Sequence, residues 1–141
     1  MIKDELVRTA IEYRQNAYAP YSNFKVGAAV QGGSGKIYGG CNMENASYGL
    51  TICAERSAIT RAVAAGEREI TRVAVVTEAA EVSMPCGACR QVILEFGREA
   101  DILCCDVEGN CNKYTTGELM PNFDDSDAFR NKLEEVKNKP K

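Results

Sequence analysis

The chain has 141 residues, a usual length for one domain and too short for two domains with separate cores. Hydrophobic residues make up 45% of the sequence and charged residues 26%, which is typical of a folded globule rather than a disordered chain. The net charge of -3 provides no positive field to attract a phosphate backbone, so the composition disfavours a nucleic-acid partner. Histidine is absent, so any metal site or proton transfer must use other side chains.

The beginning of the chain does not resemble a signal peptide, because Asp4, Glu5 and Arg8 interrupt its apolar positions. No segment approaches the roughly 20 apolar residues that cross a bilayer, so we expect no membrane partner and a cytoplasmic protein. In a reducing compartment, cysteines serve metal binding or catalysis more readily than disulfides. The odd number of cysteines, seven, agrees with that expectation.

Helical and strand patterns alternate along the chain. Apolar residues recur at helical spacing over residues 3–18, and Pro20 ends this first helix. The pattern then predicts a hairpin over 24–41, a helix over 53–65, a strand over 72–77, a helix over 86–96, strands over 101–105 and 112–115, a helical turn at Glu118 and a last helix capped by Ser126 or Asp127. This order predicts a single domain over residues 1–141, in which one mostly buried sheet has helices on both faces. Residues 124–141 would form a helical C-terminal extension with a frayed tail.

The strongest chemical signal is Cys53-Ala54-Glu55 followed, after a spacer, by Pro85-Cys86-Gly87-Ala88-Cys89. Both cysteine sets stand where a predicted helix begins, and free N–H groups and the helix dipole at such a start stabilise the thiolate that binds zinc. Three cysteines leave the fourth tetrahedral position for water, which distinguishes a catalytic zinc site from a closed structural one. The pattern therefore predicts one Zn²⁺ held by Cys53, Cys86 and Cys89, with hydrolytic chemistry.

Two side chains beside Cys53 suit this chemistry. Glu55 is a carboxylate that can accept the proton released by the zinc's water, and we predict that it is the catalytic residue. Residues two apart point about 200° away from each other in mid-helix, so Cys53 and Glu55 can share a site only at the helix's first turn. Zinc with three thiolates carries a formal charge of about -1, and we predict that Arg56 donates hydrogen bonds to sulfur and withdraws part of it.

Other interpretations of the cysteines compete with a catalytic site. A lone C-x-x-C often marks a zinc knuckle or a redox pair, although a thioredoxin-like role is disfavoured by its place past mid-chain. A closed site would need a second cysteine pair, but Cys104 and Cys105 are adjacent on a predicted strand and point to opposite faces. We expect these two as core residues, and Cys41 and Cys111 as structural residues.

The motifs together resemble a known family. Residues 53–55 with 85–91 are similar to the zinc signature of nucleoside deaminases. Segments 19–29, 40–48 and 118–121 resemble the small homotetrameric cytidine deaminases, and the likeness covers about residues 6–123. The resemblance implies an α/β fold, namely a three-layer α-β-α sandwich with a mixed five-stranded sheet, and a homotetramer with shared active sites.

The resemblance also implies which residues bind the substrate. The Phe of the F-x-V-G segment and the Asn and Glu of the N-x-E segment hold the nucleoside in the family, and residues from neighbouring subunits complete each pocket. Only Asn122 separates Pro121 from the following Phe, where family members commonly have one or two small residues. The matching positions, nucleoside contacts first and neighbour contacts last, are Phe24, Asn42, Glu44, Ala54, Ala46, Tyr48 and Phe123.

The activity implied is hydrolytic deamination of cytidine and 2'-deoxycytidine to uridine and 2'-deoxyuridine with release of ammonia, in pyrimidine salvage. A deaminase of a modified cytosine nucleoside, as in the blasticidin-type enzymes, is an alternative that segments 24–29 and 42–48 disfavour. Polynucleotide editing is disfavoured because such enzymes generally use a His ligand and need a basic surface. A structural zinc module that binds a partner and catalyses nothing is a third alternative.

Overall fold

A five-stranded sheet forms the centre of the computed structural model, which describes residues 1–79, 83–123 and 127–140. The strand order is β2-β1-β3-β4-β5. The strands are β1 (Gly27–Gly32), β2 (Ile37–Cys41), β3 (Ile70–Val76), β4 (Asp101–Cys105) and β5 (Cys111–Thr115). Strands β3 and β4 run parallel and the other neighbouring pairs run antiparallel. The predicted α/β fold with a mixed five-stranded sheet is therefore confirmed.

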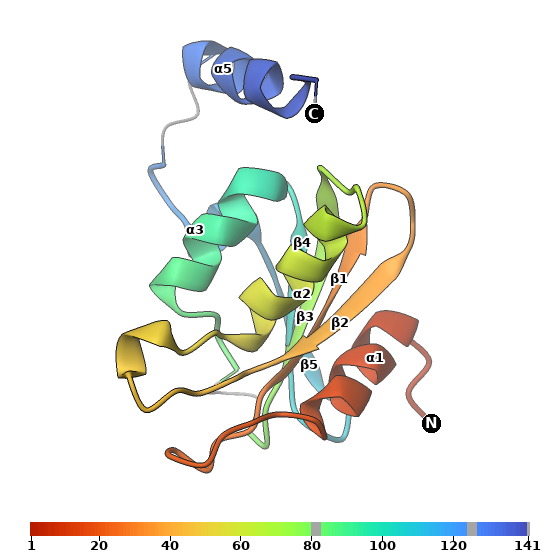
Figure 1. Ribbon diagram of the computed structural model, residues 1–141. Helices are drawn as coiled ribbons and strands as arrows, with labels where there is room; N and C mark the ends of the chain where they lie inside the picture. Colours follow the sequence, from red (N-terminus) through yellow and green to blue (C-terminus); the bar gives the residue numbers. More distant parts are fainter. Residues whose placement is uncertain (80–82, 124–126, 141) are drawn as a thin grey trace.

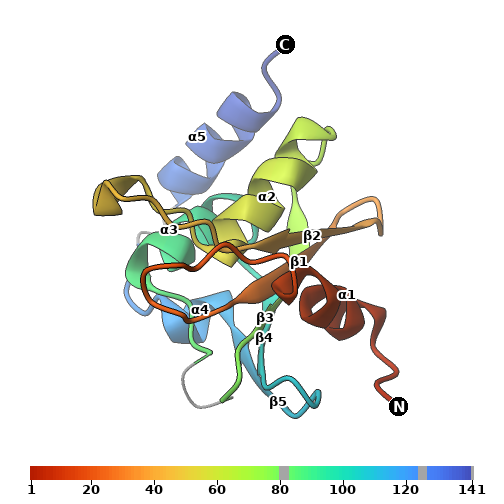
Figure 2. The same ribbon diagram turned by 60° about the horizontal axis from the view of Figure 1, so that its bottom comes forward.

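Helices cover both faces of this sheet (Figures 1 and 2). They are α1 (Glu5–Arg14), the 3-10 helix η1 (Tyr48–Leu50), α2 (Ala54–Ala64), α3 (Gly87–Phe96), α4 (Thr116–Leu119) and α5 (Asp127–Lys137). On one face, α1 buries Leu6 and Ala10 against the sheet. On the other face, α2 and α3 bury Ala58 and Ile93. The two separate clusters make the three layers that the resemblance implied.

Strand β1 begins at Gly27, three residues after the predicted start of the hairpin. The side chain of Asn42 explains the difference, because its Nδ2 donates to the carbonyl of Phe24 at 2.9 Å and its Oδ1 accepts from the N–H of Val26 at 3.0 Å. Helix α1 lies close to the start of the strand, since a Cβ at Gly27 would lie 2.0 Å from the Ala10 carbonyl oxygen.

Two cysteines differ from the expectation. Cys105 and Cys111 lie opposite each other in the β4–β5 register and form a disulfide, whereas we expected cysteines to serve metal binding or catalysis rather than disulfides. Cys105 is nevertheless a buried core residue, as predicted. The pairing depends on the register of the hairpin, which cysteine spacing alone does not specify. Cys104 and Cys105 do point to opposite faces as predicted, because Cys104 packs in the α2–α3 cluster and Cys105 in the α1 cluster.

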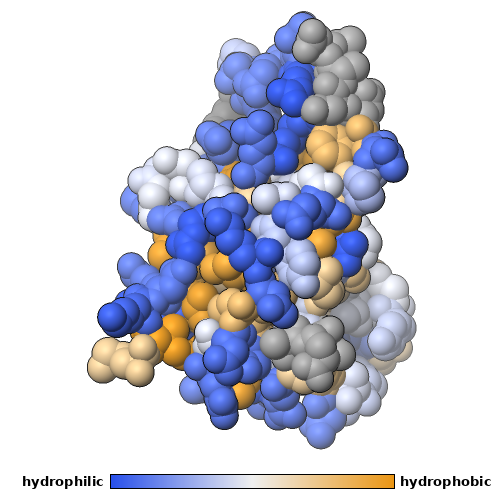
Figure 3. Space-filling view, turned by 180° about the vertical axis from the view of Figure 1, so that it is seen from behind, coloured by the Kyte–Doolittle hydropathy of each residue, from blue (hydrophilic) through white to orange (hydrophobic). Residues whose placement is uncertain are grey.

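Helix α5 lies at one end of the molecule, beyond α3 (Figure 1). Its first residue is Asp127, so Asp127 lies inside the helix rather than before it, and Ser126, the other predicted cap, lies outside the described residues. The single domain over 1–141 and the extension over 124–141 stay predictions. Within the described residues, no helix combines the length and the hydrophobicity needed to cross a membrane. Figure 3 shows a face on which hydrophilic residues surround smaller hydrophobic patches.

Glu67 joins the hairpin turn to the end of α2. Its carboxylate accepts hydrogen bonds from the N–H of Ser34 at 3.3 Å, from the Ser34 hydroxyl, and from the Tyr38 hydroxyl at 2.8 Å. These bonds, led by the one from the Ser34 side chain, hold the pKa of Glu67 below its usual value of 4.5. Because the folded-state pKa is depressed, the stability it contributes is present above pH 4.5 and is lost as pH falls through the folded-state pKa.

We predict that Glu67→Gln lowers the thermal midpoint of unfolding by several degrees at pH 7 and that the difference from the unsubstituted protein shrinks as the pH falls below 4.5. Circular dichroism melts at a series of pH values measure both effects. Glu108→Gln, at an exposed turn, is the control and should leave the midpoint unchanged. A loss that is the same at every pH would show that the ionised carboxylate is not the cause.

Candidate active site

Three sulfur atoms meet where helices α2 and α3 begin. Cys53 is the N-cap of α2, Cys86 is the N-cap of α3, and Cys89 lies in the first turn of α3. The three Sγ atoms lie within 4.8 Å of one another, with Cys53 to Cys86 at 3.9 Å and Cys86 to Cys89 at 3.5 Å. The structure thus brings together all three predicted ligands, which come from two distant segments of the chain.

The spacing of these sulfurs fits a zinc ion. A Zn–S bond of about 2.3 Å in a tetrahedron places the sulfurs about 3.8 Å apart, and the observed separations of 3.5 and 3.9 Å lie on either side of that value. Within the described residues, the sulfurs of Cys53 and Cys86 accept no hydrogen bond from the backbone N–H groups at the start of their own helices. Both sulfurs are therefore available to a metal at a point toward which two helix dipoles are directed.

The guanidinium of Arg56 forms a hydrogen bond with one of the three cysteines. Arg56 donates from Nη2 to the Sγ of Cys53 at 3.3 Å, as predicted. A hydrogen bond from Cys89 is the main cause that lowers the pKa of Cys53 to about 5, and the hydrogen bond from Arg56 contributes to the shift. The pKa of Cys89 rises, because Cys89 keeps the proton that the two thiols share. Thiolate is the form that binds metal, so this arrangement prepares Cys53 for binding at neutral pH.

Glu55 lies in the first turn of α2, two residues after the N-cap Cys53, which is the geometry that the sequence required. Its side chain is buried, with 4% of the residue exposed. Burial is the main cause that raises the pKa of Glu55 to about 7, and the negative charge of Cys53 adds to the shift. A carboxyl group that titrates near neutral pH can both accept and return a proton.

Asn42 and Glu44 share one side of their segment, as their spacing predicted. Both are buried, whereas Met43 between them is 51% exposed. Glu44 accepts hydrogen bonds from the N–H groups of Tyr21 and Ser22 at 3.0 and 3.1 Å and from the Ser22 hydroxyl. In this structure the two side chains hold the loop over residues 18–26, and their contact with a nucleoside stays a prediction.

The other predicted substrate-binding residues differ in exposure. Ala54 is fully buried at the start of α2, next to Cys53. Phe24, on the loop that Asn42 holds, is 43% exposed. Ala46 is exposed, and Tyr48 at the start of η1 is 74% exposed. Side chains this exposed on one chain are free to contact a second one.

Phe123 lies far from the cysteines of its own chain. The Arg98 guanidinium lies 5.0 Å from the centroid of its ring, and Arg98 directly follows the C-cap of α3. The cysteines are at the other end of that ten-residue helix, about 15 Å away at 1.5 Å per residue. Phe123 therefore does not complete its own chain's site, and its contact with a neighbouring pocket stays a prediction.

Sequence interpretation missed one residue that touches the metal-binding loop. Arg90 follows Cys89, and its guanidinium donates to the carbonyls of Pro85 and Leu119 at 2.8 and 3.1 Å. The position stands inside the deaminase-like signature, but hydrogen bonds to main-chain carbonyls leave no pattern in the sequence. Only the fold shows which carbonyls the side chain reaches.

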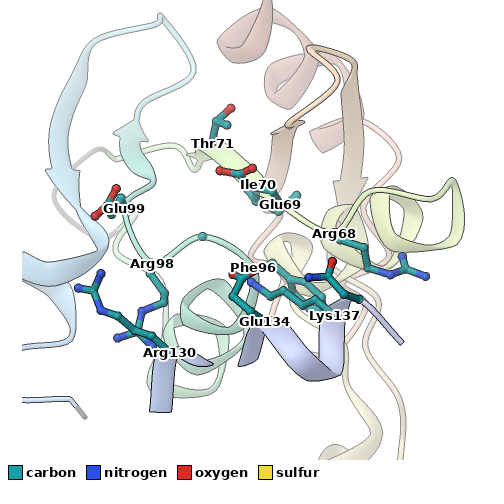
Figure 4. Close-up of a pocket in the computed structure, with 12 residues that line it drawn as sticks. Arg68, Glu69, Ile70, Thr71, Phe96, Arg98, Glu99, Arg130, Glu134 and Lys137 are labelled. Carbon is teal, nitrogen blue, oxygen red and sulfur yellow. The ribbon is translucent and has the colours of Figure 1, made fainter. Parts of the chain in front are cut away.

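A hollow of about 670 Å³ lies elsewhere, between α5 and the C-terminal end of α3 (Figure 4). Its walls carry charges of both signs, so they provide no field for a ligand of one charge. The charged residues that line it are Arg68, Glu69, Arg98, Glu99, Arg130, Glu134 and Lys137. None of the predicted site residues is among the residues that line this hollow.

Comparisons with known proteins agree with the geometry. Residues 1–105 match the family model described as the cytidine and deoxycytidylate deaminase zinc-binding region. The chain is similar to cytidine deaminases of Halalkalibacterium halodurans, at 42% identity over 86% of this chain and 92% of the relative, and of Mycobacterium tuberculosis, at 46% identity over 85% and 84%. A crystal structure of cytidine deaminase from Burkholderia pseudomallei superposes with a TM-score of 0.80 at 46% identity, covering 86% of this chain and 98% of the other.

We predict that the chain holds about one zinc ion and that Cys86→Ala loses most of it, because the variant lacks one of the three sulfurs that would hold the ion. Atomic absorption after gel filtration measures zinc per chain. Cys41→Ser is the matched control, because Cys41 is a free cysteine outside the group of three sulfurs. Equal zinc in Cys86→Ala and Cys41→Ser would contradict the site.

Proposed function

The chain belongs to the cytidine and deoxycytidylate deaminase family, and from this premise we propose that it hydrolyses the C4 amino group of cytidine and 2'-deoxycytidine. The products would be uridine, 2'-deoxyuridine and ammonia, in pyrimidine salvage in the cytoplasm. The observation that carries the proposal is the meeting of three cysteine sulfurs at two helix starts, with the buried carboxyl of Glu55 in the first turn of one helix. The comparisons do not favour a blasticidin-type substrate.

Cys53, Cys86 and Cys89 would hold one Zn²⁺ per chain. When bound, the ion supplies a Lewis acid that activates water as a nucleophile at neutral pH. Three negative sulfurs weaken a Lewis acid, and Arg56 counters this by donating a hydrogen bond to Cys53 at 3.3 Å. The N-termini of α2 and α3 act in the same direction, because Cys53 and Cys86 are their N-caps and so lie at the positive ends of the two helix dipoles.

Glu55 would move the protons. It accepts the proton that the attacking water gives up and delivers it to N3 of the cytosine ring as the C4–O bond forms. It then carries the proton of the new hydroxyl group to the amine, so that the C4–N bond breaks, ammonia leaves and C4 becomes a carbonyl. One carboxyl group serves both steps because burial raises its pKa to about 7, close to the pH of the reaction.

Phe24, Asn42, Glu44 and Ala54 would bind the nucleoside, with the Phe24 ring against the base and the two polar side chains near the ribose. Both polar side chains face the same way and lie on one segment, which supports a shared contact with a pair of hydroxyl groups.

A homotetramer with shared pockets accounts for an apolar surface. Segments 18–24 and 43–50 each carry several exposed large hydrophobic side chains, and the Tyr18–Met43 bridge joins the two segments. Such a patch is typical of an interaction surface. We propose that Ala46, Tyr48 and Phe123 contact the pockets of neighbouring subunits. The exposed residues are Tyr18, Tyr21, Phe24, Met43, Tyr48 and Leu50.

Glu55→Gln should keep its zinc and lose turnover by about 10²- to 10⁴-fold, because the variant cannot transfer the proton. The decline of cytidine's ultraviolet absorbance measures turnover, and the same assay with deoxycytidine and blasticidin S compares the substrates. Glu95→Gln, an exposed change on α3, should match the unsubstituted enzyme. Zinc-loaded protein that leaves all three substrates unchanged would favour a structural zinc module instead.

Subunit mixing tests the shared pocket. Tyr48→Ser and Glu55→Gln chains should each be poorly active alone, whereas co-refolded chains should regain activity in about one pocket in four by random assembly. Such a pocket combines Glu55 from one chain with Tyr48 from another. A mixture that is no more active than the average of its two parents would contradict a contribution of Tyr48 across subunits.

A further inference from the structure

Arg90 makes contacts on both sides of the proposed zinc ligand Cys86. Its Nε donates to the carbonyl of Pro85 at 2.8 Å, and its own backbone N–H donates to the carbonyl of Cys86 at 2.9 Å. These two carbonyls belong to the peptide units before and after the Cα of Cys86. Because each peptide unit is planar, fixing both carbonyls restricts both backbone dihedrals of Cys86 and so the direction of its sulfur.

The guanidinium of Arg90 also donates a hydrogen bond to a carbonyl of another element. Its Nη1 donates to the carbonyl of Leu119 at 3.1 Å, and Leu119 is the last residue of α4. The chain continues from α4 to Phe123, which the proposed function assigns to a neighbouring pocket. One side chain therefore joins the loop of a zinc ligand to the segment that leads to the next subunit.

The chemistry of these contacts requires arginine. Pro85 is fully buried, and a buried carbonyl that loses its partner carries a desolvation cost. A guanidinium presents several N–H groups in a rigid fork that reaches two carbonyls at once, whereas the ammonium of lysine is a single point charge on a flexible stem. Hydrogen bonds from an ionised donor are also stronger than those between neutral groups.

We propose that Arg90 is a positioning residue that holds Cys86 in the geometry of the zinc site and connects this loop to the end of α4. It acts through the main chain of residues 85, 86 and 119 and not on the substrate. The proposal rests on the proposed function for the assignment of Cys86 as a zinc ligand. Its consequence is that Arg90 sets how slowly zinc leaves the protein, beyond any effect on folding.

Zinc release from the loaded protein into a chromophoric chelator tests this role. Arg90→Lys should release zinc about 10- to 100-fold faster than the unsubstituted protein, because changes to groups that orient metal ligands lower metal affinity by about that factor. The matched control is Arg61→Lys, because Arg61 also donates to a main-chain carbonyl, that of Gly39 at 2.6 Å, but lies on α2 away from the sulfurs. Equal release from Arg90→Lys and the unsubstituted protein, or an equal acceleration in Arg61→Lys, would overturn the proposal.

Chemical rescue separates positioning from a general loss of structure. Arg90→Ala should also release zinc quickly, and millimolar ethylguanidinium should slow the release again, whereas ethylammonium at the same concentration should not. No difference between the two cations would overturn the proposal, and circular dichroism of each variant reports whether it is folded. Zinc content and cytidine turnover of the unsubstituted chain test the proposed function separately, so a failure there is distinct from a failure of the Arg90 role.

Discussion

The parallel pairing of β3 with β4 is the constraint on which the site depends. A parallel pair needs a crossover, and α3 supplies it, so α3 must begin near the carboxyl end of β3 and run back along the sheet. Helix α2 precedes β3 and must end near the amino end of the same strand, so it begins at the same edge as α3. Two helix starts therefore meet at one edge of the sheet, and each begins with a cysteine.

Close packing of α2 against the sheet restricts where α2 begins relative to α3. Ala54, Ala58 and Ala62 line its buried face, and a Cβ at Gly40 of β2 would lie 2.5 Å from the backbone N of Ala58. Small residues on both sides let the helix lie against the strand with little freedom to shift, because interiors are packed to crystal-like density. The same packing buries Glu55 one residue beyond Ala54. The fold thus determines both where the sulfurs meet and how far the carboxyl group of Glu55, the proposed catalytic residue, is shielded from water.

Sequence patterns were sufficient for the five strands, for helices α1 to α5 and for the three cysteines that meet at the site, because each depends on local chemistry, whereas the 3-10 helix η1 was not predicted. Cys53 and Cys86 stand before runs of helix-forming residues, so their N-cap positions follow from the chain itself. The features that escaped prediction depend on contacts between distant segments. The Cys105–Cys111 disulfide needs the β4–β5 register, and the late start of β1 needs the Asn42 amide to compete for main-chain groups 16 and 18 residues away.

This chain has no histidine and gathers three cysteines at its metal site, and the negative charge of their thiolates has two opposite effects on the proposed reaction. It weakens the Lewis acid, which Arg56 and two helix dipoles counter from outside the site. It also raises the pKa of the buried Glu55, whose value of about 7 owes part of its shift to Cys53. The sulfur charge that makes water harder to ionise thus makes Glu55 a stronger base for the same proton. In the proposed mechanism, hydrolysis at neutral pH therefore depends on Glu55 remaining buried beside the thiolates, which is the position that its place in the first turn of α2 provides.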